Sequence, residues 1–214
     1  MPRRVLVYGT SANPPVGMGG HMGIVEHFAH EFDEVWVLPV YQHIYSSKRH
    51  LETFEHRVAM LQLGCASIPS GDRVRINTTE RDVWLRTLAT YEGDPSTIRI
   101  GSVDIIADLQ ARHPDVAFSW LLGADTYIDL LQGKWKGGLA LLDMVDVVVI
   151  HREGVDGLDT TARPRVTIAR VPTLDDSSST KARQSVAAAT ALVLPPVLEY
   201  MKTHGLYAFA ATST

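Results

Sequence analysis

Two short segments near opposite ends of the sequence carry residue types that bind phosphate. Residues 9–23, GTSANPPVGMGGHMG, are rich in glycine, and helical sequence follows from His21. Glycine lets backbone N–H groups approach a ligand closely, and the amino end of a helix adds partial positive charge. Residues 178–183, SSTKAR, place hydroxyls at a helix start and a guanidinium one turn later. Both patterns favour a phosphate-binding site, although a glycine-rich connection without a ligand stays open for the first segment taken alone.

Other nucleotide-binding and catalytic patterns fit the first segment poorly. No Gly-Lys-Ser/Thr triplet follows it, so it is not a P-loop. The dinucleotide-binding fingerprint needs its third glycine one place before Gly23, and the second strand ends in Leu-Pro-Val without an acidic residue for a ribose. A serine-hydrolase elbow is disfavoured because Asn13 stands where its second glycine belongs.

The two segments together resemble the nucleotidyltransferase superfamily. Its first motif is GxFxPxHxGH, and most of that motif is supplied by Gly9, Thr10, Asn13, Pro14, Gly20 and His21. Its second motif is ISSTxxR, which residues 178–183 match, with Ser177 in place of isoleucine. Gly123 and Asp125 resemble the superfamily's GxD segment. The likeness extends from about residue 5 to 207 and is strongest to the nicotinate and nicotinamide mononucleotide adenylyltransferases.

The resemblance implies transfer of AMP from ATP to nicotinate or nicotinamide mononucleotide, with release of pyrophosphate in NAD biosynthesis. It implies catalytic roles for His21, Lys48 and Arg183. The implied ATP-binding residues are Gly9, Thr10, Gly20, His21, Gly123, Asp125, Ser178, Ser179, Thr180 and Arg183. The implied mononucleotide-binding residues are Asn13, Lys48, Arg57 and Trp135, the last by stacking on the pyridine ring. Mg²⁺ is expected to be bound mainly through the ATP phosphates, without a protein metal site.

The sequence departs from the superfamily at Met18, which stands where the first motif histidine belongs. A methionine cannot donate a hydrogen bond to phosphate. Either that histidine is dispensable, or another residue such as His43 replaces it, or activity is reduced. Two alternatives therefore stand: a non-catalytic nucleotide-binding or regulatory protein on the same fold, and an adenylyl- or cytidylyltransferase with another phosphorylated acceptor.

The elements that must position these residues alternate between strand and helix. Strands are predicted at residues 5–8, 35–40, 74–77, 118–122, 145–150 and 166–171, and helices at 21–31, 55–66 and 103–112. This alternation predicts an α/β fold with a Rossmann-like, doubly wound parallel sheet, of the nucleotidyltransferase type. A small C-terminal helical portion is expected to begin near Pro195 and to stop at Gly205.

Composition sets the remaining limits. A chain of 214 residues predicts one domain, residues 1–214. A net charge of −4 argues against nucleic-acid binding, and Cys65, as the only cysteine, cannot form an internal disulfide. Without an apolar run of membrane-spanning length, or a signal peptide, the chain is expected in the cytoplasm. A homo-oligomer is compatible with the sequence. The sequence determines neither the oligomeric state nor the preference between nicotinate and nicotinamide mononucleotide.

Trp36 and Trp120 are predicted to lie in the core, whereas Trp84 has no predicted place.

Overall fold

The computed structural model describes residues 2–42, 51–151 and 163–210. Its centre is a six-stranded sheet with the order β3-β2-β1-β4-β5-β6, and every neighbouring pair is parallel. The strands are β1 (Arg3–Thr10), β2 (Glu34–Pro39), β3 (Val74–Ile76), β4 (Val116–Gly123), β5 (Asp146–Ile150) and β6 (Val166–Ala169). All six predicted strands are therefore confirmed, with ends that differ by a few residues.

The helices are α1 (His21–Ala29), α2 (Phe54–Ala66), α3 (Thr79–Thr90), α4 (Ser102–Arg112), α5 (Ala124–Leu131), α6 (Gly138–Met144), α7 (Ser179–Ala182), α8 (Val186–Leu192) and α9 (Pro195–Thr203). Short 3₁₀ turns cover Gly71–Arg73, Pro95–Thr97 and Tyr207–Phe209. The sequence did not predict α3. Its buried residues are Thr79 and Glu80, so the helix has no apolar stripe from which periodicity could be recognised.

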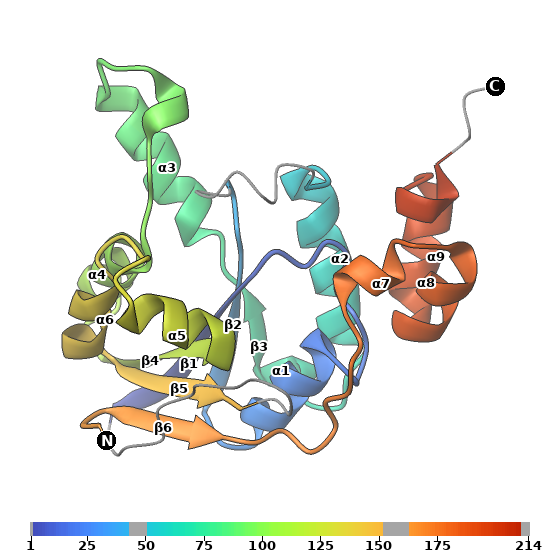
Figure 1. Ribbon diagram of the computed structural model, residues 1–214, viewed down its shortest axis with the longest axis horizontal. Coiled ribbons are helices and arrows are strands. Elements are labelled where there is room, and N and C mark those ends of the chain that lie inside the picture. The colour runs from blue at the N-terminus through green and yellow to red at the C-terminus, as the bar shows by residue number, and fades with distance from the viewer. Residues whose placement is uncertain (1, 43–50, 152–162, 211–214) are drawn as a thin grey trace.

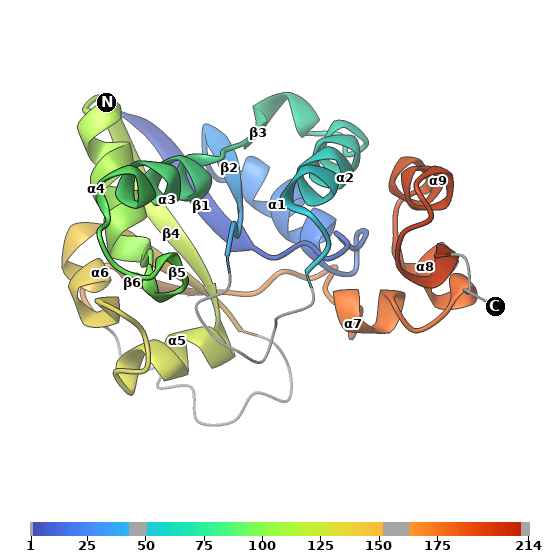
Figure 2. The ribbon, with the colours of Figure 1, turned by 90° about the horizontal axis from the view of Figure 1, so that it is seen from above.

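Helices cover both faces of the sheet because successive strand side chains point to opposite faces. Val5 and Val7 of β1 pack with α4, α5 and α6, while Leu6 between them packs with α1 and α2. Figure 2 shows these two helical layers on either side of the strands. Trp36 and Trp120, each 3% exposed, lie in the first of these cores as predicted. The doubly wound arrangement is therefore confirmed.

A C-terminal helical unit, α8 and α9, packs outside α2 and away from the sheet (Figure 1). It has its own apolar cluster, to which Val16 and Met60 from the main body contribute. Helix α9 runs from Pro195 to Thr203 with His204 as its C-cap, and Gly205 follows with φ of 59°, the left-handed conformation that commonly stops a helix. Both predicted boundaries are confirmed. Among the described helices, none is long and apolar enough to cross a membrane.

Candidate active site

The sheet order reverses between β1 and β4, and this is where the predicted site residues gather. Tyr8 of β1 lies opposite Leu121 of β4, so Thr10 and Gly123 end the two strands at the same edge. In open parallel sheets, ligands bind in the crevice outside the carboxyl ends of strands at such a point. Helix α5 begins directly after Gly123, and Asp125 lies exposed in its first turn. A Cβ atom at Gly123 would lie 2.8 Å from Asp125 Oδ1, so glycine leaves room for this carboxylate.

The loop between β1 and α1 packs so closely, on itself and on the first turn of α1, that Gly19 in the loop and Gly23 in the helix have no room for a side chain. A Cβ atom at Gly23 would lie 1.9 Å from the carbonyl oxygen of Met18, and one at Gly19 would lie 2.4 Å from Asp175 Oδ2. The N–H of Gly17 also donates to the carbonyl of Leu192, at 2.8 Å. The loop is thus held both by its own backbone and by the C-terminal unit.

His21 is the first residue of α1, and its tautomer is set by the loop. The Val16 N–H donates to His21 Nδ1 at 3.2 Å, so a neutral imidazole carries its proton on Nε2. No side chain caps the α1 amino end among the residues described, and its first turn has no acidic residue. A half-buried N–H donor beside an uncapped helix amino end is suited to hydrogen-bond an anion such as a phosphate oxygen.

Helix α7 brings the second motif to the first. Ser179 Oγ donates to the carbonyl of Pro14 at 2.7 Å, and the Arg183 guanidinium donates to the carbonyl of Asn13. Arg183 Nη2 also donates to Thr180 Oγ1 at 3.2 Å. Two segments that are 165 to 170 residues apart in sequence therefore meet, as the resemblance implied.

The hydroxyls of the second motif have protein partners, and one of them forms the helix cap that the sequence predicted. Ser178 Oγ accepts from the Lys181 N–H at 3.2 Å and so caps α7. Ser179 and Thr180 are engaged with Pro14 and Arg183, as described above. Arg183 is half-buried, and its guanidinium has further N–H groups beyond those bonded to Asn13 and Thr180. It is the group of this motif best suited to a phosphate.

Arg57, which the resemblance implied as a mononucleotide ligand, is buried and bonded to two backbone carbonyls. Only 1% of it is exposed, its Nε donates to the carbonyl of Glu52 at 2.9 Å, and its Nη1 donates to the carbonyl of Ser11 at 3.0 Å. Burial lowers the pKa of its guanidinium, an effect opposed by nearby Tyr207 and acidic groups. Arg57 therefore joins α2 to the loop after β1, whereas a surface phosphate ligand would have been exposed.

Asn13 is 3% exposed and lies at the junction of these contacts. Its Oδ1 accepts from the Glu52 N–H at 2.9 Å and from the Tyr207 hydroxyl at 2.7 Å. Asn13 was predicted to bind the mononucleotide, but its side-chain oxygen is already bonded to these protein groups. Sequence reasoning did not assign a role to Tyr207 or Glu52. The one signal for Tyr207 was its place in residues 204–207, which resemble the pyridine-nucleotide branch.

Trp135 lies in the connection between α5 and α6, half-buried against the core beneath α4, α5 and α6. The sequence predicted a ring exposed at the site, and the structure shows one that is partly exposed and partly packed against this core. Its neighbour Lys136 donates to the carbonyl of Arg99 at 2.6 Å and to Asp104 at 3.1 Å, and so fixes the connection onto α4. Lys48 and His43 fall outside the described residues.

A further aromatic group lies near the carboxyl end of β2. Tyr41 contacts the rings of Phe54 and Trp84, with centroids 5.1 Å and 5.3 Å away. Trp84, which had no predicted place, thus packs against Tyr41 near the end of β2. Next to them the buried Glu80 carboxylate accepts from the Tyr41 N–H at 2.9 Å. Burial raises the pKa of Glu80 to about 7, although the backbone hydrogen bonds and Arg57 act in the opposite direction.

Within residues 2–42, 51–151 and 163–210, no group of three or more His, Cys, Asp or Glu side chains is placed to hold a metal ion. Asp125 lies in the first turn of α5, after the carboxyl end of β4. An ion that prefers several oxygen ligands, such as Mg²⁺, would therefore have to take most of them from a bound phosphate ligand and water.

A doubly wound parallel sheet with a phosphate-suited loop at its switch point defines the class of nucleotide-binding α/β proteins. Comparison with known proteins narrows this class. The cytidylyltransferase-like family model matches residues 8–185. A probable nicotinate-nucleotide adenylyltransferase of Myxococcus xanthus (strain DK1622) is 32% identical over 98% of this chain and 97% of its own length. A relative of the same name from Bacillus pumilus is 29% identical over 96% of this chain and 98% of its own.

Solved structures agree in fold. The Plasmodium falciparum nicotinic acid mononucleotide adenylyltransferase complexed with NaAD superposes with a TM-score of 0.76 at 18% identity, over 98% of this chain and 100% of that one. The same enzyme complexed with APC gives the same values. The chain belongs to the cytidylyltransferase-like family of nucleotidyltransferases.

Proposed function

We propose that this chain transfers AMP from ATP to nicotinate mononucleotide, releases pyrophosphate and forms the dinucleotide in NAD biosynthesis. The observation that carries the proposal is the meeting of His21 and Arg183, from the two motifs, around one loop at the sheet's switch point. Full-length relatives named for this activity support it, as does the fold shared with an adenylyltransferase that binds NaAD.

The reaction needs two anions brought together and the charge on the transferred group neutralised. A phosphate oxygen of the mononucleotide attacks the α-phosphorus of ATP, the bond from this phosphorus to the bridging oxygen breaks, and pyrophosphate leaves. In our proposal His21 Nε2–H donates to an α-phosphate oxygen, and the Arg183 guanidinium binds the β- and γ-phosphates. Further ATP contacts would come from the remaining residues of the crevice: Gly9, Thr10, Gly20, Gly123, Asp125, Ser178, Ser179 and Thr180.

Nucleotidyltransferases of this kind generally use Mg²⁺. We propose that the ion binds mainly through ATP phosphate oxygens, where it supplies charge neutralisation. The exposed Asp125 at the α5 start, next to the end of β4, could add a ligand directly or through water.

The acceptor would lie on the side of the crevice formed by Trp135 and by the end of β2. Stacking of the half-buried Trp135 on the pyridine ring, and a phosphate contact from Lys48, complete this proposal. For Asn13 and Arg57 the contacts favour an indirect role, because both groups hold the loop after β1 in place. We also propose that the chain acts in the cytoplasm on these soluble substrates, without nucleic acid or membrane.

The test is pyrophosphate release from ATP and Mg²⁺, with nicotinate and nicotinamide mononucleotides assayed separately. The wild-type chain should release pyrophosphate only when a mononucleotide is present. His21→Ala should lower kcat by about 10²–10³, the usual effect of losing one transition-state donor. His27→Ala is the matched control, since His27 lies on the same helix and pairs with Glu31 at 3.3 Å. Equal activity of His21→Ala and wild type would reject the proposed role of His21.

Met18 favours a second candidate, a nucleotide-binding protein without transferase activity. Its side chain is 37% exposed and offers no donor where the motif places a histidine. Binding of ATP without pyrophosphate release, with either mononucleotide or with other phosphorylated acceptors, would support this candidate. Release that depends on another acceptor would instead support a transferase of different specificity.

A further inference from the structure

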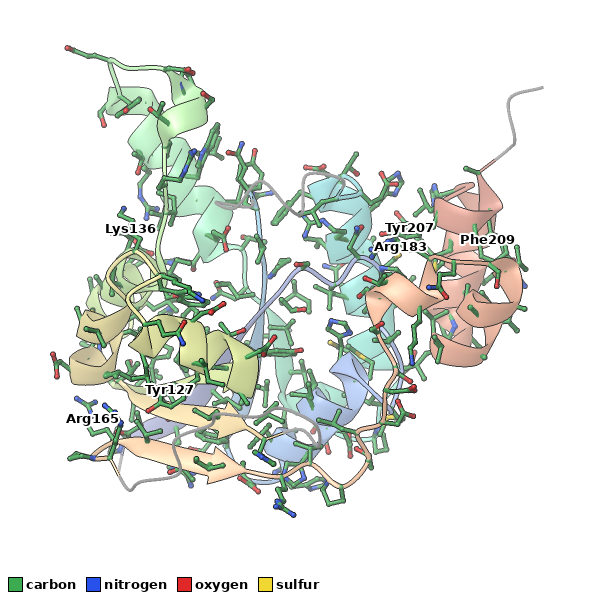
Figure 3. All side chains as sticks on the ribbon, in the orientation of Figure 1. Tyr127, Lys136, Arg165, Arg183, Tyr207 and Phe209 are labelled. Atoms are coloured by element: carbon green, nitrogen blue, oxygen red, sulfur yellow. The ribbon has the colours of Figure 1, made fainter. Side chains whose placement is uncertain are left out.

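The C-terminal unit sends one polar side chain into the candidate active site. Tyr207 follows α9 and begins the last 3₁₀ turn, with φ of 54°, a conformation that residues other than glycine adopt where their surroundings hold them. Figure 3 shows Tyr207 beside Arg183, where α7 meets the C-terminal helices. Burial raises the pKa of the Tyr207 hydroxyl, Glu52 adds to this, and Arg57 and Arg183 oppose it. Both guanidinium groups thus lie near enough to the hydroxyl to act on its pKa.

The Tyr207 hydroxyl reaches Arg183 through Asn13. It donates to Asn13 Oδ1 at 2.7 Å, and the backbone carbonyl of Asn13 accepts from the Arg183 guanidinium. The same Oδ1 accepts from the Glu52 N–H at 2.9 Å, so the side chain of Asn13 is held from two directions. With the Asn13 side chain fixed, its carbonyl presents one defined acceptor to the Arg183 guanidinium.

We infer that Tyr207 is a positioning residue, whose hydroxyl fixes Asn13 and thereby aims the Arg183 guanidinium at the outer phosphates of the nucleotide. The inference rests on the proposed function for the identity of that nucleotide. It adds a residue from outside both motifs to the site and gives the C-terminal unit a part in nucleotide binding.

Other contacts already hold the C-terminal unit to the main body. Its apolar cluster includes Met60 of α2 and Val16 of the loop, and Tyr200 lies 2.9 Å from His56 Nδ1 across the α2–α9 contact. A phenylalanine at position 207 would keep the ring and its packing while removing one hydrogen bond. Docking of the unit and positioning of Arg183 can therefore be separated by experiment.

The experiment compares the binding of three ligands to wild type and Tyr207→Phe: a non-hydrolysable ATP analogue, pyrophosphate and AMP. We expect the Kd for the ATP analogue and for pyrophosphate to rise about tenfold, the scale of one hydrogen bond. The Kd for AMP should change less than about twofold, because AMP lacks the phosphates that Arg183 would bind. In the transfer reaction, kcat should fall by a similar factor of about ten.

Tyr200→Phe is the matched control, since it removes a hydroxyl from the same unit at its contact with α2. It should leave all three Kd values unchanged. In an Arg183→Ala background, Tyr207→Phe should add no further loss for pyrophosphate. Unchanged ATP-analogue binding in Tyr207→Phe, an equal loss for all three ligands, or an equal loss in Tyr200→Phe would each overturn the inference. If wild type binds these ligands but transfers nothing to the mononucleotides, the proposed function fails, and the ligand comparison still decides the role of Tyr207.

Discussion

The two sides of the crevice are built in different ways. The half proposed to bind ATP (the ATP half), residues 9–21 with 178–183, is joined by hydrogen bonds between its two motifs, such as Ser179 to Pro14. The half proposed to bind the acceptor (the acceptor half) is represented here by Glu80 and Trp135, with Arg57 at its border with the loop after β1. Its side chains are buried or packed within their own surroundings. We therefore expect a half-buried motif side chain of the ATP half, such as Arg183, to be replaceable with less effect on folding than a buried side chain of the acceptor half. In the acceptor half we expect one substitution to change both binding and stability.

The largest effect is expected for Arg183→Ala. Its guanidinium is half-buried and has donors beyond those bonded to Asn13 and Thr180, so its loss should remove charge stabilisation from the transition state. We expect kcat to fall by about 10²–10³. The free energy of unfolding, measured in urea, should change by less than about 1 kcal/mol. Lys181→Ala removes a charge from the same helix and should keep most activity. A large loss of stability in Arg183→Ala would remove the contrast between the halves.

In the acceptor half, Glu80 should make stability depend on pH. Its folded-state pKa of about 7 lies above its ordinary 4.5. The stabilising contribution is therefore fully present below pH 4.5 and is lost as pH rises through 7. The difference corresponds to about 3 kcal/mol. Urea unfolding of wild type at pH 5 and pH 8 should show this loss, and Glu80→Gln should lack it. The exposed Glu55 provides a control, because Glu55→Gln should keep the wild-type dependence.

Arg57→Met should destabilise the chain by about 2 kcal/mol, because the carbonyls of Ser11 and Glu52 lose their donors inside the protein. Urea unfolding measures this. The matched control is Arg73→Met, since the exposed Arg73 also donates to a carbonyl, that of Ala29 at 3.3 Å. It should cost less than about 0.5 kcal/mol. Equal effects of the two substitutions would mean that Arg57 does not hold the loop, and its predicted phosphate contact would regain support.

Trp135→Ala should raise the KM for the mononucleotide about tenfold, the scale of a stacking contact of 0.5–2 kcal/mol, and leave the KM for ATP unchanged. It should also lower the free energy of unfolding, since part of the ring packs against the core. Trp135→Phe keeps an aromatic face and should restore most of the affinity. A loss of stability without any change in KM would assign the ring to packing alone.

The smallest effect is expected for Met18→His. The side chain is 37% exposed, so a histidine can be accommodated without repacking the core. One added donor is worth about 0.5–1.5 kcal/mol, or a two- to tenfold rise in kcat. Steady-state pyrophosphate release measures it, and Met18→Gln tests whether any polar side chain suffices. A fall in kcat with the histidine would show that this chain uses the position differently from the superfamily motif.

The strands and the two phosphate motifs could be predicted from the sequence. Buried parallel strands need runs of β-branched residues, and close backbone approach in a turn needs glycine, so both leave a local pattern. The sequence did not indicate α3, whose buried residues are Thr79 and Glu80. It also predicted a ligand role for Arg57, because a charged side chain in a sequence gives no sign of its burial. The contacts of Asn13 with Tyr207 and Glu52 depend on segments that are 194 and 39 residues away. Such contacts arise from tertiary packing and leave no local pattern.

The turn between β1 and α1 has a consequence for how the motif can vary between relatives. The carbonyl oxygen of Met18 lies in this turn, 1.9 Å from where a Cβ atom of residue 23 would lie. Met18 itself is 37% exposed to solvent. The shape of the loop therefore constrains the backbone at this position and the glycine at position 23, but not the side chain at position 18. We therefore expect histidine and methionine to be exchangeable at position 18 without a change in the fold, so that the exchange alters the chemistry of the loop and not its shape.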